Sequence, residues 1–263
     1  MQYDLVVADM DGTLLRDDKT LSERTLRAIR RYQDAGGHFT IATGRCYEGT
    51  GRYMKDLDLR SPYVLLNGCL VHDPTTGADI LCRRLPVPVL EQIWPVLEEH
   101  GLNVVVYDPR KATTRAMNEM VAEHQRHDGI GLVVAPDLGP TTLGDMVKVL
   151  TIAAPSILDR VEAIVTSTKA QVRMVRSYPH YLEFLPESGG KGAALEALRV
   201  HLGIPRERTM AIGDGLNDLD LLQAAGCSVA MANAHPAVKA VADRLTTSNM
   251  EDGVAHVLEG LVE

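Results

Sequence analysis

The chain of 263 residues has few aromatic side chains: one Trp, two Phe and eight Tyr make up 4% of it. Proteins that bind single-stranded nucleic acid stack bases on such rings, so this scarcity argues against a nucleic-acid partner. Basic residues are in the minority, 27 against 35 acidic ones, and the net charge of −8 argues against binding to a DNA or RNA backbone. A small anionic substrate is still compatible if a metal ion and one or two basic groups reverse the field locally.

Cysteine and long hydrophobic runs are also scarce. Cys46, Cys69, Cys82 and Cys227 form no Cys-x-x-Cys pair, which argues against a zinc site and a disulfide scaffold and favours free thiols in a reducing compartment. No basic and apolar leader precedes the first expected strand. The longest stretch without a charged residue, 221–238, is interrupted by Gly, Asn, His and Pro and is not typical of a membrane span. We therefore expect a cytoplasmic protein with no membrane partner.

A pair of carboxylates at the end of an apolar run is the most informative feature that is present. Residues 5–8 are apolar, Asp9 and Asp11 follow two positions apart, and Gly12 comes next. Side chains i and i+2 of a strand share a face, and Gly12 lets the backbone leave the sheet. Two close carboxylates call for a cation or a shared proton, which indicates a metal site or proton transfer. A plain Asx turn uses the same letters and is the alternative reading of this segment.

Strands and helices are expected to alternate at both ends of the chain. The expected strands lie at 5–8, 39–42, 63–66, 209–212 and 228–230. The expected helices lie between Ser22 and Gly36, and at 47–56, 192–202, 218–225, 236–242 and 253–261. This alternation predicts an α/β fold with a Rossmann-like parallel sheet.

The middle of the chain has a different pattern. Helices are expected at 89–100 and 157–165, strands at 104–107, 147–152, 171–176 and 181–185, and a loose Gly-, Pro- and Asp-rich region at 129–144. Adjacent strands with helices to one side indicate an α+β insert with an antiparallel sheet. We therefore predict two domains, a core of residues 1–81 and 187–263 and an inserted domain of residues 82–186.

Polar clusters follow the apolar strands of the predicted core. They are Asp9 with Asp11, Thr43 with Gly44, Asn67 with Gly68, and Gly213 with Asp214. In an open parallel sheet, ligands bind outside the carboxyl ends of the strands, so these separate segments are expected to meet at one edge.

Four segments of the chain, three of which contain these polar clusters, resemble the motifs of the haloacid dehalogenase (HAD) superfamily phosphatases. In chain order they are Asp9-Met10-Asp11-Gly12-Thr13-Leu14, Ala42-Thr43-Gly44-Arg45, Gly189-Gly190-Lys191-Gly192 and Gly213-Asp214-Gly215-Leu216-Asn217-Asp218. Their order and spacing are similar to those of the Cof-type phosphatases, which carry a C2 (IIB-like) cap between the second and third motifs. The resemblance covers the whole chain. It implies a HAD core, a cap that sets specificity, and Mg²⁺-dependent hydrolysis of small phosphorylated metabolites, with sugar phosphates expected.

The resemblance also implies roles for individual residues. Asp9 is the nucleophile that forms an aspartyl phosphate, and Asp11 protonates the leaving group and then activates water. Asp9, the main-chain carbonyl of Asp11 and the Asp214 carboxylate are implied as Mg²⁺ ligands. With Asp11 protonated, Mg²⁺ offsets the charges of Asp9 and Asp214, and Lys191 leaves a net positive charge for the phosphate. Taken by itself, Lys191 would be read as a solvated surface lysine.

Other motif positions keep two interpretations each. The hydroxyl of Thr43 and the N–H groups of Thr43 and Gly44 suit phosphate oxygens near a helix N-terminus, although Thr43 could simply cap that helix. Arg45 contacts the substrate or braces the cap. Asn217 and Asp218 contribute to the phosphate and metal sites, or they cap the following helix.

In the insert, Arg110, Arg115, Arg173 and Arg176 are candidate substrate contacts, with ordinary surface charge as the simpler reading. His235 has no nucleophilic Ser or Cys partner in the pattern, so a hydrolase triad is not supported. Two alternatives to a phosphatase are a phosphomutase of the same superfamily and a non-enzymatic sugar-phosphate sensor. The expected oligomeric state is a monomer or a homodimer.

Overall fold

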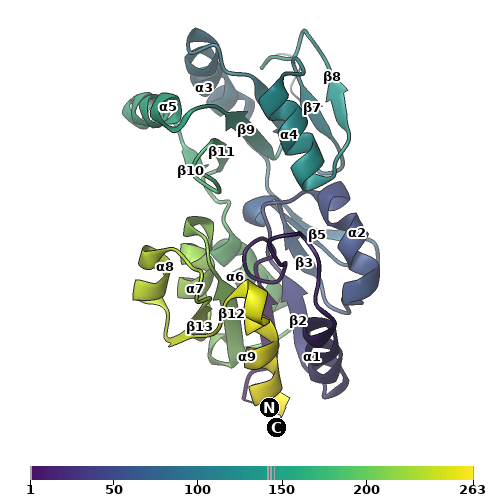
Figure 1. The fold of residues 1–263 in the computed structure, drawn as a ribbon. Coiled ribbons are helices and arrows are strands. Elements are labelled where there is room, and N and C mark those ends of the chain that lie inside the picture. The colour runs from purple at the N-terminus through teal and green to yellow at the C-terminus, as the bar shows by residue number, and fades with distance from the viewer. Residues whose placement is uncertain (1, 141, 143, 145, 263) are drawn as a thin grey trace. The chain divides into compact units, whose positions relative to one another are not determined.

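A computed structural model describes residues 2–140, 142, 144 and 146–262, and the chain divides into two compact units (Figure 1). The first unit comprises residues 1–44, 52–81 and 190–263, and the second comprises residues 45–51 and 82–189. The long segment of the second unit begins at Cys82. It also takes in residues 45–51 and 187–189, which the sequence had assigned to the core.

A five-stranded parallel sheet in the order β14-β13-β12-β1-β2 forms the centre of the first unit. Its strands are β1 (Leu5–Ala8), β2 (His38–Ile41), β12 (Thr209–Gly213), β13 (Cys227–Ala230) and β14 (Arg244–Leu245). Every residue of β1 is buried, and the strand is paired on both sides, which explains its unbroken apolar sequence. The predicted Rossmann-like parallel core is confirmed.

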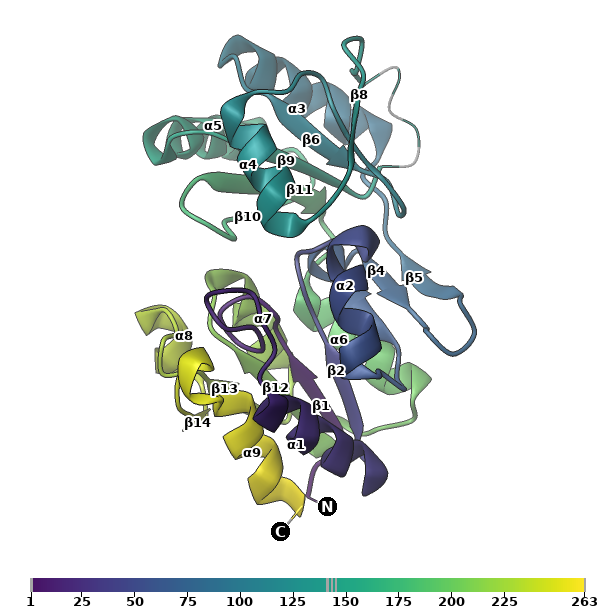
Figure 2. The same ribbon diagram turned by 45° about the vertical axis from the view of Figure 1, so that its right-hand side comes forward.

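Helices cover both faces of this sheet. They are α1 (Glu23–Asp34), α6 (Lys191–His201), α7 (Leu219–Ala224), α8 (Pro236–Val241) and α9 (Gly253–Val262), with short 3-10 turns η1 (Leu66–Gly68), η2 (Arg206–Arg208), η3 (Leu216–Asp218) and η4 (Asn249–Glu251). Helix α2 (Tyr47–Leu57) begins in the second unit and ends in the first. Helix α1 packs against α9 on one face, and α6 packs against α7 on the other (Figures 1 and 2). Ser22 caps α1, because its hydroxyl accepts a hydrogen bond from the Thr25 N–H at 3.0 Å.

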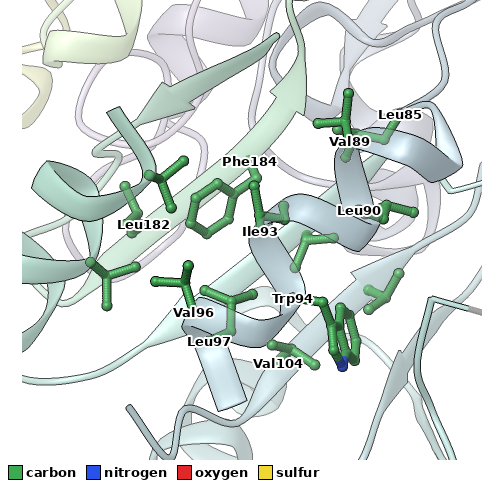
Figure 3. Packing of buried hydrophobic residues seen from close by; sticks show 14 of the residues in the cluster. Leu85, Val89, Leu90, Ile93, Trp94, Val96, Leu97, Val104, Leu182 and Phe184 are labelled. Atoms are coloured by element: carbon green, nitrogen blue, oxygen red, sulfur yellow. The ribbon is translucent and has the colours of Figure 1, made fainter. Parts of the chain in front are cut away.

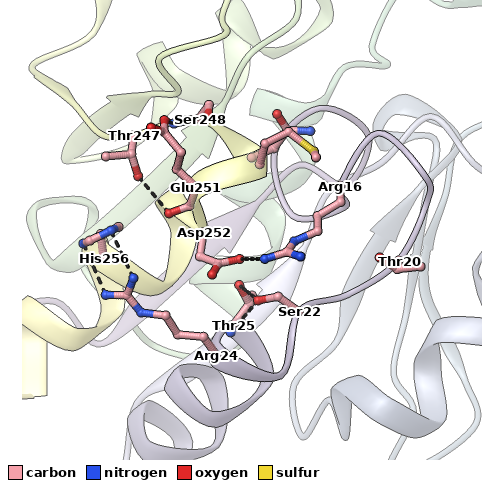
Figure 4. Close-up of polar contacts among 12 residues, drawn as sticks. Arg16, Thr20, Ser22, Arg24, Thr25, Thr247, Ser248, Glu251, Asp252 and His256 are labelled. Carbon is pink, nitrogen blue, oxygen red and sulfur yellow. Dashed lines mark hydrogen bonds and ion pairs between the residues drawn. The ribbon is translucent and has the colours of Figure 1, made fainter.

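Polar contacts join the N-terminal loop of the first unit to its C-terminal helix (Figure 4). Arg16, in the loop that follows β1, pairs with Asp252 at 2.9 Å. Arg24 on α1 donates to the Glu259 carboxylate at 2.6 Å and lies 3.2 Å from Nε2 of His256. These contacts connect the loop after β1 to Asp252, the residue before α9, and connect α1 to α9 itself.

A small three-stranded sheet follows α2, in the order β3-β4-β5. Its strands are β3 (Tyr63–Leu65), β4 (Leu70–His72) and β5 (Asp79–Cys82). A parallel bridge between Ala42 and Val64 links it to the main sheet. Only β3 was predicted. The Asn67-Gly68 pair ends the expected strand before β4, and none of the four residues of β5 is buried, so β5 lacks an apolar face.

The second unit is built on a six-stranded sheet in the order β10-β11-β9-β6-β7-β8, antiparallel except where β7 pairs with β8. Its strands are β6 (Val104–Tyr107), β7 (Ala112–Thr114), β8 (Leu132–Val134), β9 (Lys148–Ile152), β10 (Val172–Val175) and β11 (Tyr181–Pro186). Its helices are α3 (Val87–Glu99), α4 (Glu119–Asp128) and α5 (Pro155–Thr168). The predicted α+β insert is confirmed as a fold class.

The expected loose region 129–144 is only partly irregular. It contains β8, whose Val133 and Val134 side chains are exposed. An exposed strand of this length carries no periodic signal, which is why it was missed. Residues 141 and 143 of that region lie outside the described residues.

The two faces of this second sheet differ in character. Helices α3 and α5 pack on one face, where Ile93, Trp94, Leu182 and Phe184 lie in an apolar cluster (Figure 3). Alternation along the strands sends Tyr181 and Glu183 to the other face. That face carries the buried ion pair between Lys148 and Glu183 at 3.0 Å.

Among the described residues, no helix is both long and apolar enough to cross a membrane.

Candidate active site

The first carboxylate of the site leaves the central sheet directly at the end of β1. The Asp9 N–H donates to the Ile212 carbonyl at 2.9 Å, so the residue is still held by the strand ladder. Its side chain is almost completely buried. Gly12 follows with φ of +78°, and a Cβ there would lie 2.3 Å from Oδ2 of Asp214. Glycine is therefore required for the loop to pass this close to the second carboxylate.

Lys191 lies at the start of α6 and is fully buried, so the reading of a solvated surface lysine is wrong. Its Nζ donates to Oδ1 of Asp9 and to Oδ1 of Asp218, each at 2.6 Å. Burial by itself would lower the pKa of the ammonium, but the charges of Asp218 and Asp9 outweigh it, and the pKa of Lys191 is raised. The lysine is thus a permanent cation against the Asp9 carboxylate.

Asp218 fixes the turn that presents Asp214. Its Oδ2 accepts the N–H groups of Asp214 and Gly215 at 3.0 and 2.9 Å, while its Oδ1 accepts from Lys191. Both oxygens are therefore engaged by protein donors. Thr13 adds a bond from its hydroxyl to Oδ1 of Asp214 at 2.6 Å. No role was predicted for Thr13, although its place in the first motif was a usable signal.

The site carries more negative than positive charge. Ligand oxygens of Asp9, Asp214 and Asp218 lie within 4.8 Å of one another, and the ammonium of Lys191 contacts two of these carboxylates. Burial and repulsion by Asp218 raise the pKa of Asp214 to about 7, and burial with the same repulsion raises the pKa of Asp9. Such excess charge, presented by oxygen donors, suits a hard divalent cation.

Asp11 has a different partner from Asp9. Its Oδ1 accepts from Nζ of Lys19 at 2.8 Å, and its side chain is more exposed than that of Asp9, 17% against 8%. Lys19 adopts the left-handed conformation with φ of +64°, which is uncommon for a residue with a side chain. Lys19 was missed, since nothing in the sequence pairs two residues across this loop.

The second-motif residues meet the fourth motif through Asn67. The Thr43 carbonyl accepts the Asn67 N–H at 2.9 Å, and a methyl group on Gly44 would lie 3.1 Å from Oδ1 of Asn67. Asn217 donates from Nδ2 to the same Oδ1 at 3.3 Å. Asn67 was noted only at a strand end that could be a simple turn. Its left-handed backbone, with φ of 51°, allows it to join Thr43, Gly44 and Asn217.

Arg45 belongs to the second unit and is buried there. Its guanidinium donates to the main-chain carbonyls of Asp128 at 3.0 Å and Gly49 at 3.5 Å. Of the two roles expected for Arg45, these bonds correspond to bracing the insert. Two of the candidate arginines of the insert also have acidic partners, since Arg115 pairs with Glu98 at 2.8 Å and Arg176 with Asp159 at 2.6 Å.

Asn233 also contributes to this edge of the first unit. Its Nδ2 donates to the Gly12 carbonyl at 2.7 Å and thereby helps to hold the turn after Asp11. Its position, between β13 and α8, gave no signal in the sequence. Its contact joins segments 221 residues apart, and that separation is why it could not be predicted.

Comparisons with known proteins agree with this geometry. The family profile of haloacid dehalogenase-like hydrolases matches residues 6–258. The Bacillus subtilis protein YitU, a 5-amino-6-(5-phospho-D-ribitylamino)uracil phosphatase, is 33% identical over 97% of this chain and 96% of its own length. The phosphatase YwpJ of the same organism is 26% identical over 98% of this chain and 99% of its own length.

Solved structures show the same likeness. A haloacid dehalogenase-like hydrolase from Bacteroides thetaiotaomicron superposes with a TM-score of 0.88 at 28% identity, covering 98% of this chain and 99% of the other. A Thermotoga maritima protein, TM0651, superposes with a TM-score of 0.85 at 31% identity, covering 98% and 97%. The chain therefore belongs to the haloacid dehalogenase-like hydrolases, among which it is a phosphatase.

Proposed function

We propose that this phosphatase is Mg²⁺-dependent and hydrolyses small phosphorylated metabolites through an aspartyl phosphate on Asp9. The observation that supports this most strongly is the arrangement around Asp9. One of its oxygens is held by Lys191, which Asp218 fixes in turn, and a further carboxylate, Asp214, lies within ligand distance. Recognition of a phosphate alone would not need a buried carboxylate at this position, because that carboxylate repels the ligand.

The donor set suits Mg²⁺. The carboxylates of Asp9 and Asp214 and the main-chain carbonyl of Asp11 would hold the ion. Asp218 belongs to the site as the group that orders Asp214, since protein donors engage both of its oxygens. When bound, Mg²⁺ supplies positive charge that offsets the carboxylates and the phosphoryl oxygens.

In the first step, a carboxylate oxygen of Asp9 attacks phosphorus, and the bond from phosphorus to the ester oxygen breaks. The carboxylic acid of Asp11 gives its proton to that leaving oxygen, so an alcohol departs. The ammonium of Lys191, the Thr43 hydroxyl and the Gly44 N–H stabilise negative charge on the phosphoryl oxygens. Asn217 and Asn67 hold the Gly44 turn in place for this contact.

In the second step, water attacks the phosphorus of the aspartyl phosphate. Asp11, now a carboxylate, takes a proton from that water, and the bond from phosphorus to the Asp9 oxygen breaks. Inorganic phosphate leaves and Asp9 is restored. Lys19 holds the Asp11 carboxylate at 2.8 Å and acts as a positioning residue for it in this step.

The second unit is proposed to set substrate specificity, as an insert placed between the phosphate-binding segments can do. Small phosphorylated compounds are the expected substrates, sugar phosphates among them. The name of YitU, which specifies a phosphorylated ribityl compound, supports this class.

The proposal is tested by hydrolysis of p-nitrophenyl phosphate with Mg²⁺, with EDTA, and by an Asp9→Asn variant. We expect EDTA and Asp9→Asn each to abolish release of inorganic phosphate. Asp56→Asn is the matched control, because Asp56 is exposed on α2, and it should retain full activity. Undiminished phosphate release by Asp9→Asn would exclude the mechanism. Conversion of a sugar phosphate into an isomer without phosphate release would identify a phosphomutase.

A further inference from the structure

The turn that carries Asp11 is closed by its own main chain. Three consecutive N–H groups, those of residues 13–15, donate to the Met10 carbonyl at 2.8–3.3 Å. Asp11 also pairs with Leu15 in an isolated β-bridge. Buried carbonyls of such a turn need donors from other segments of the chain. The source of those donors therefore decides what holds Asp11 in place.

Asn249, at the start of η4, supplies one of these donors and is only 5% exposed. Its Nδ2 donates to the Leu15 carbonyl at 3.0 Å and to Oδ1 of Asp17 at 2.9 Å. Since both partners are acceptors, they fix which end of the amide is the donor. An ion pair of Arg16 with Asp252, at 2.9 Å, joins the same two segments (Figure 4). Asn249 is thus bonded at the end of the turn.

A second amide connects Asn249 to the other side of the turn. The Asn249 N–H donates to Oδ1 of Asn233 at 3.1 Å, and Nδ2 of Asn233 donates to the Gly12 carbonyl at 2.7 Å. Gly12 follows Asp11 directly, and Leu15 pairs with Asp11. The two linked amides therefore bond the main chain on both sides of Asp11.

Asn249 also contacts the turn that follows. Its partner Asp17 lies in the turn that carries Lys19, and Nζ of Lys19 donates to Oδ1 of Asp11 at 2.8 Å. One amide is therefore bonded both to the turn that carries Asp11 and to the turn that carries its cationic partner. All of these residues belong to the first unit.

The bonds of Asn249 matter for the reaction because of what they hold. Loss of a buried hydrogen bond lowers stability wherever it occurs, so a loss of stability alone would not reveal a role in the reaction. Asp11, however, is proposed to give a proton to the leaving oxygen, and a displacement of about 1 Å of a reacting group can lower a rate about 100-fold.

We propose that Asn249, acting together with Asn233, is a positioning residue that holds Asp11 in place for proton transfer to the leaving oxygen. It acts through the main chain of the turn and not by contact with the reacting atoms. The inference rests on the proposed function, in which Asp11 is the general acid.

The test compares kcat/KM for p-nitrophenyl phosphate and phenyl phosphate in the wild type and in Asn249→Ala, with Mg²⁺. Nitrophenolate leaves readily without a proton, whereas phenolate is a stronger base and depends more on the general acid. We expect Asn249→Ala to lower kcat/KM about tenfold or more for phenyl phosphate and less than about threefold for p-nitrophenyl phosphate. A purely structural role would lower both values in the same proportion.

Thr209→Val is the matched control. Thr209 is fully buried at the start of β12, whereas Asp214 follows the end of that strand. Its hydroxyl donates to the Arg206 carbonyl at 2.6 Å, so the substitution also removes a bond to a main-chain carbonyl. We expect it to lower the melting temperature and to leave the ratio of the two kcat/KM values unchanged. Thermal unfolding with Mg²⁺ verifies that each variant is folded.

Asn233→Ala provides a second variant that decides the question if Asn249→Ala does not fold. The Asn233 side chain is exposed, and its loss should shift the ratio in the same direction. An unchanged ratio in either folded variant, or the same shift in Thr209→Val, would overturn the positioning role. These outcomes leave the phosphatase proposal intact, because the wild type still releases phosphate. Failure of the wild type to hydrolyse either ester would instead refute the proposed function.

Discussion

At the scale of a single residue, Lys191 joins the carboxylate of Asp9, which follows β1, to the carboxylate of Asp218 in the fourth motif. It is buried and bonded to Asp9 and Asp218. Such a buried ionic triad is costly to desolvate, and well-packed apolar residues in place of all three side chains would match or exceed its stability. Its presence is therefore better explained by chemistry than by stability. In the proposed mechanism the ammonium contacts the phosphoryl oxygens and keeps Asp9, the nucleophile, oriented at the same time.

We expect Lys191→Met to abolish phosphatase activity and to destabilise the protein by about 3–5 kcal/mol at neutral pH, because it leaves buried carboxylates without their cation. The pKa of Asp9 is already raised and should rise further without the ammonium. A raised carboxyl pKa costs stability above that pKa, and the cost fades as protonation occurs, so the loss should be smaller at pH 5 than at pH 8.

Urea unfolding of the two proteins at both pH values measures this loss. Lys55→Met, at an exposed position of α2, is the control and should change stability by less than about 0.5 kcal/mol. A Lys191→Met protein as stable as the wild type at pH 8 would argue against the assigned charge state of the site.

The residues of the site differ in how far the sequence predicted them. Asp9, Lys191 and Asp214 were found because each lies in a short motif with a recognisable composition. Lys19 and Asn233 were not found, since each acts through a contact that depends on how a loop folds back. The role of Asn67 depends on its left-handed backbone conformation. Asn tolerates this conformation, but the neighbouring residues in the sequence do not indicate it.

At the scale of elements, the turn after β1 is limited by space. Gly12 and Gly36 both have positive φ, +78° and +91°, but only at Gly12 would a Cβ collide, with Asp214 at 2.3 Å. Substitution of Gly36 therefore tests backbone strain alone, whereas substitution of Gly12 adds a steric conflict with Asp214.

Gly36→Ala should cost about 1–2 kcal/mol of stability from the left-handed backbone and leave kcat/KM unchanged. Gly12→Ala should cost more than that, and it should lower kcat/KM about 100-fold, because Asp214 must move away from its position beside Asp9. Thermal unfolding and steady-state kinetics of the two variants measure both effects. Equal kinetic effects in both variants would mean that the close approach of Gly12 to Asp214 is unimportant.

Long or strongly apolar elements were the predictable ones. The strand β1 is buried on both faces, and α1 carries its cap Ser22, so both have clear local signals. Helix α4 went unnoticed, because Val121, His124 and Asp128 are its buried residues and only one of them is apolar. The polar face of the second sheet, where α4 lies, could not be inferred for the same reason.

At the scale of the whole molecule, the first unit gathers its site from stretches separated by the insert. Asp9 and Lys191 are 182 residues apart in the chain, yet their side chains are bonded at 2.6 Å. The three clustered carboxylates, those of Asp9, Asp214 and Asp218, all belong to the first unit. A cation bound there stabilises the folded state, because the unfolded chain has no such cluster.

We expect Mg²⁺ to raise the melting temperature of the EDTA-treated protein, equivalent to about 2.7 kcal/mol at a hundredfold excess over Kd. Asp214→Asn should lose this dependence. Without metal the variant should be at least as stable as the wild type, because burial and repulsion by Asp218 raise the pKa of Asp214 to about 7 and Asn removes that repulsion. Differential scanning calorimetry with and without Mg²⁺ measures both. An undiminished Mg²⁺ response in Asp214→Asn would place the ion elsewhere.

The most direct test of the account is to trap the covalent intermediate. The enzyme is mixed with a good substrate and Mg²⁺, quenched in acid during turnover, digested, and examined by mass spectrometry. The account predicts an acid-stable, hydroxylamine-sensitive phosphoryl group on Asp9, and none on any residue of the Asp9→Asn variant. A phosphoryl group on another side chain, or rapid turnover by Asp9→Asn, would contradict it.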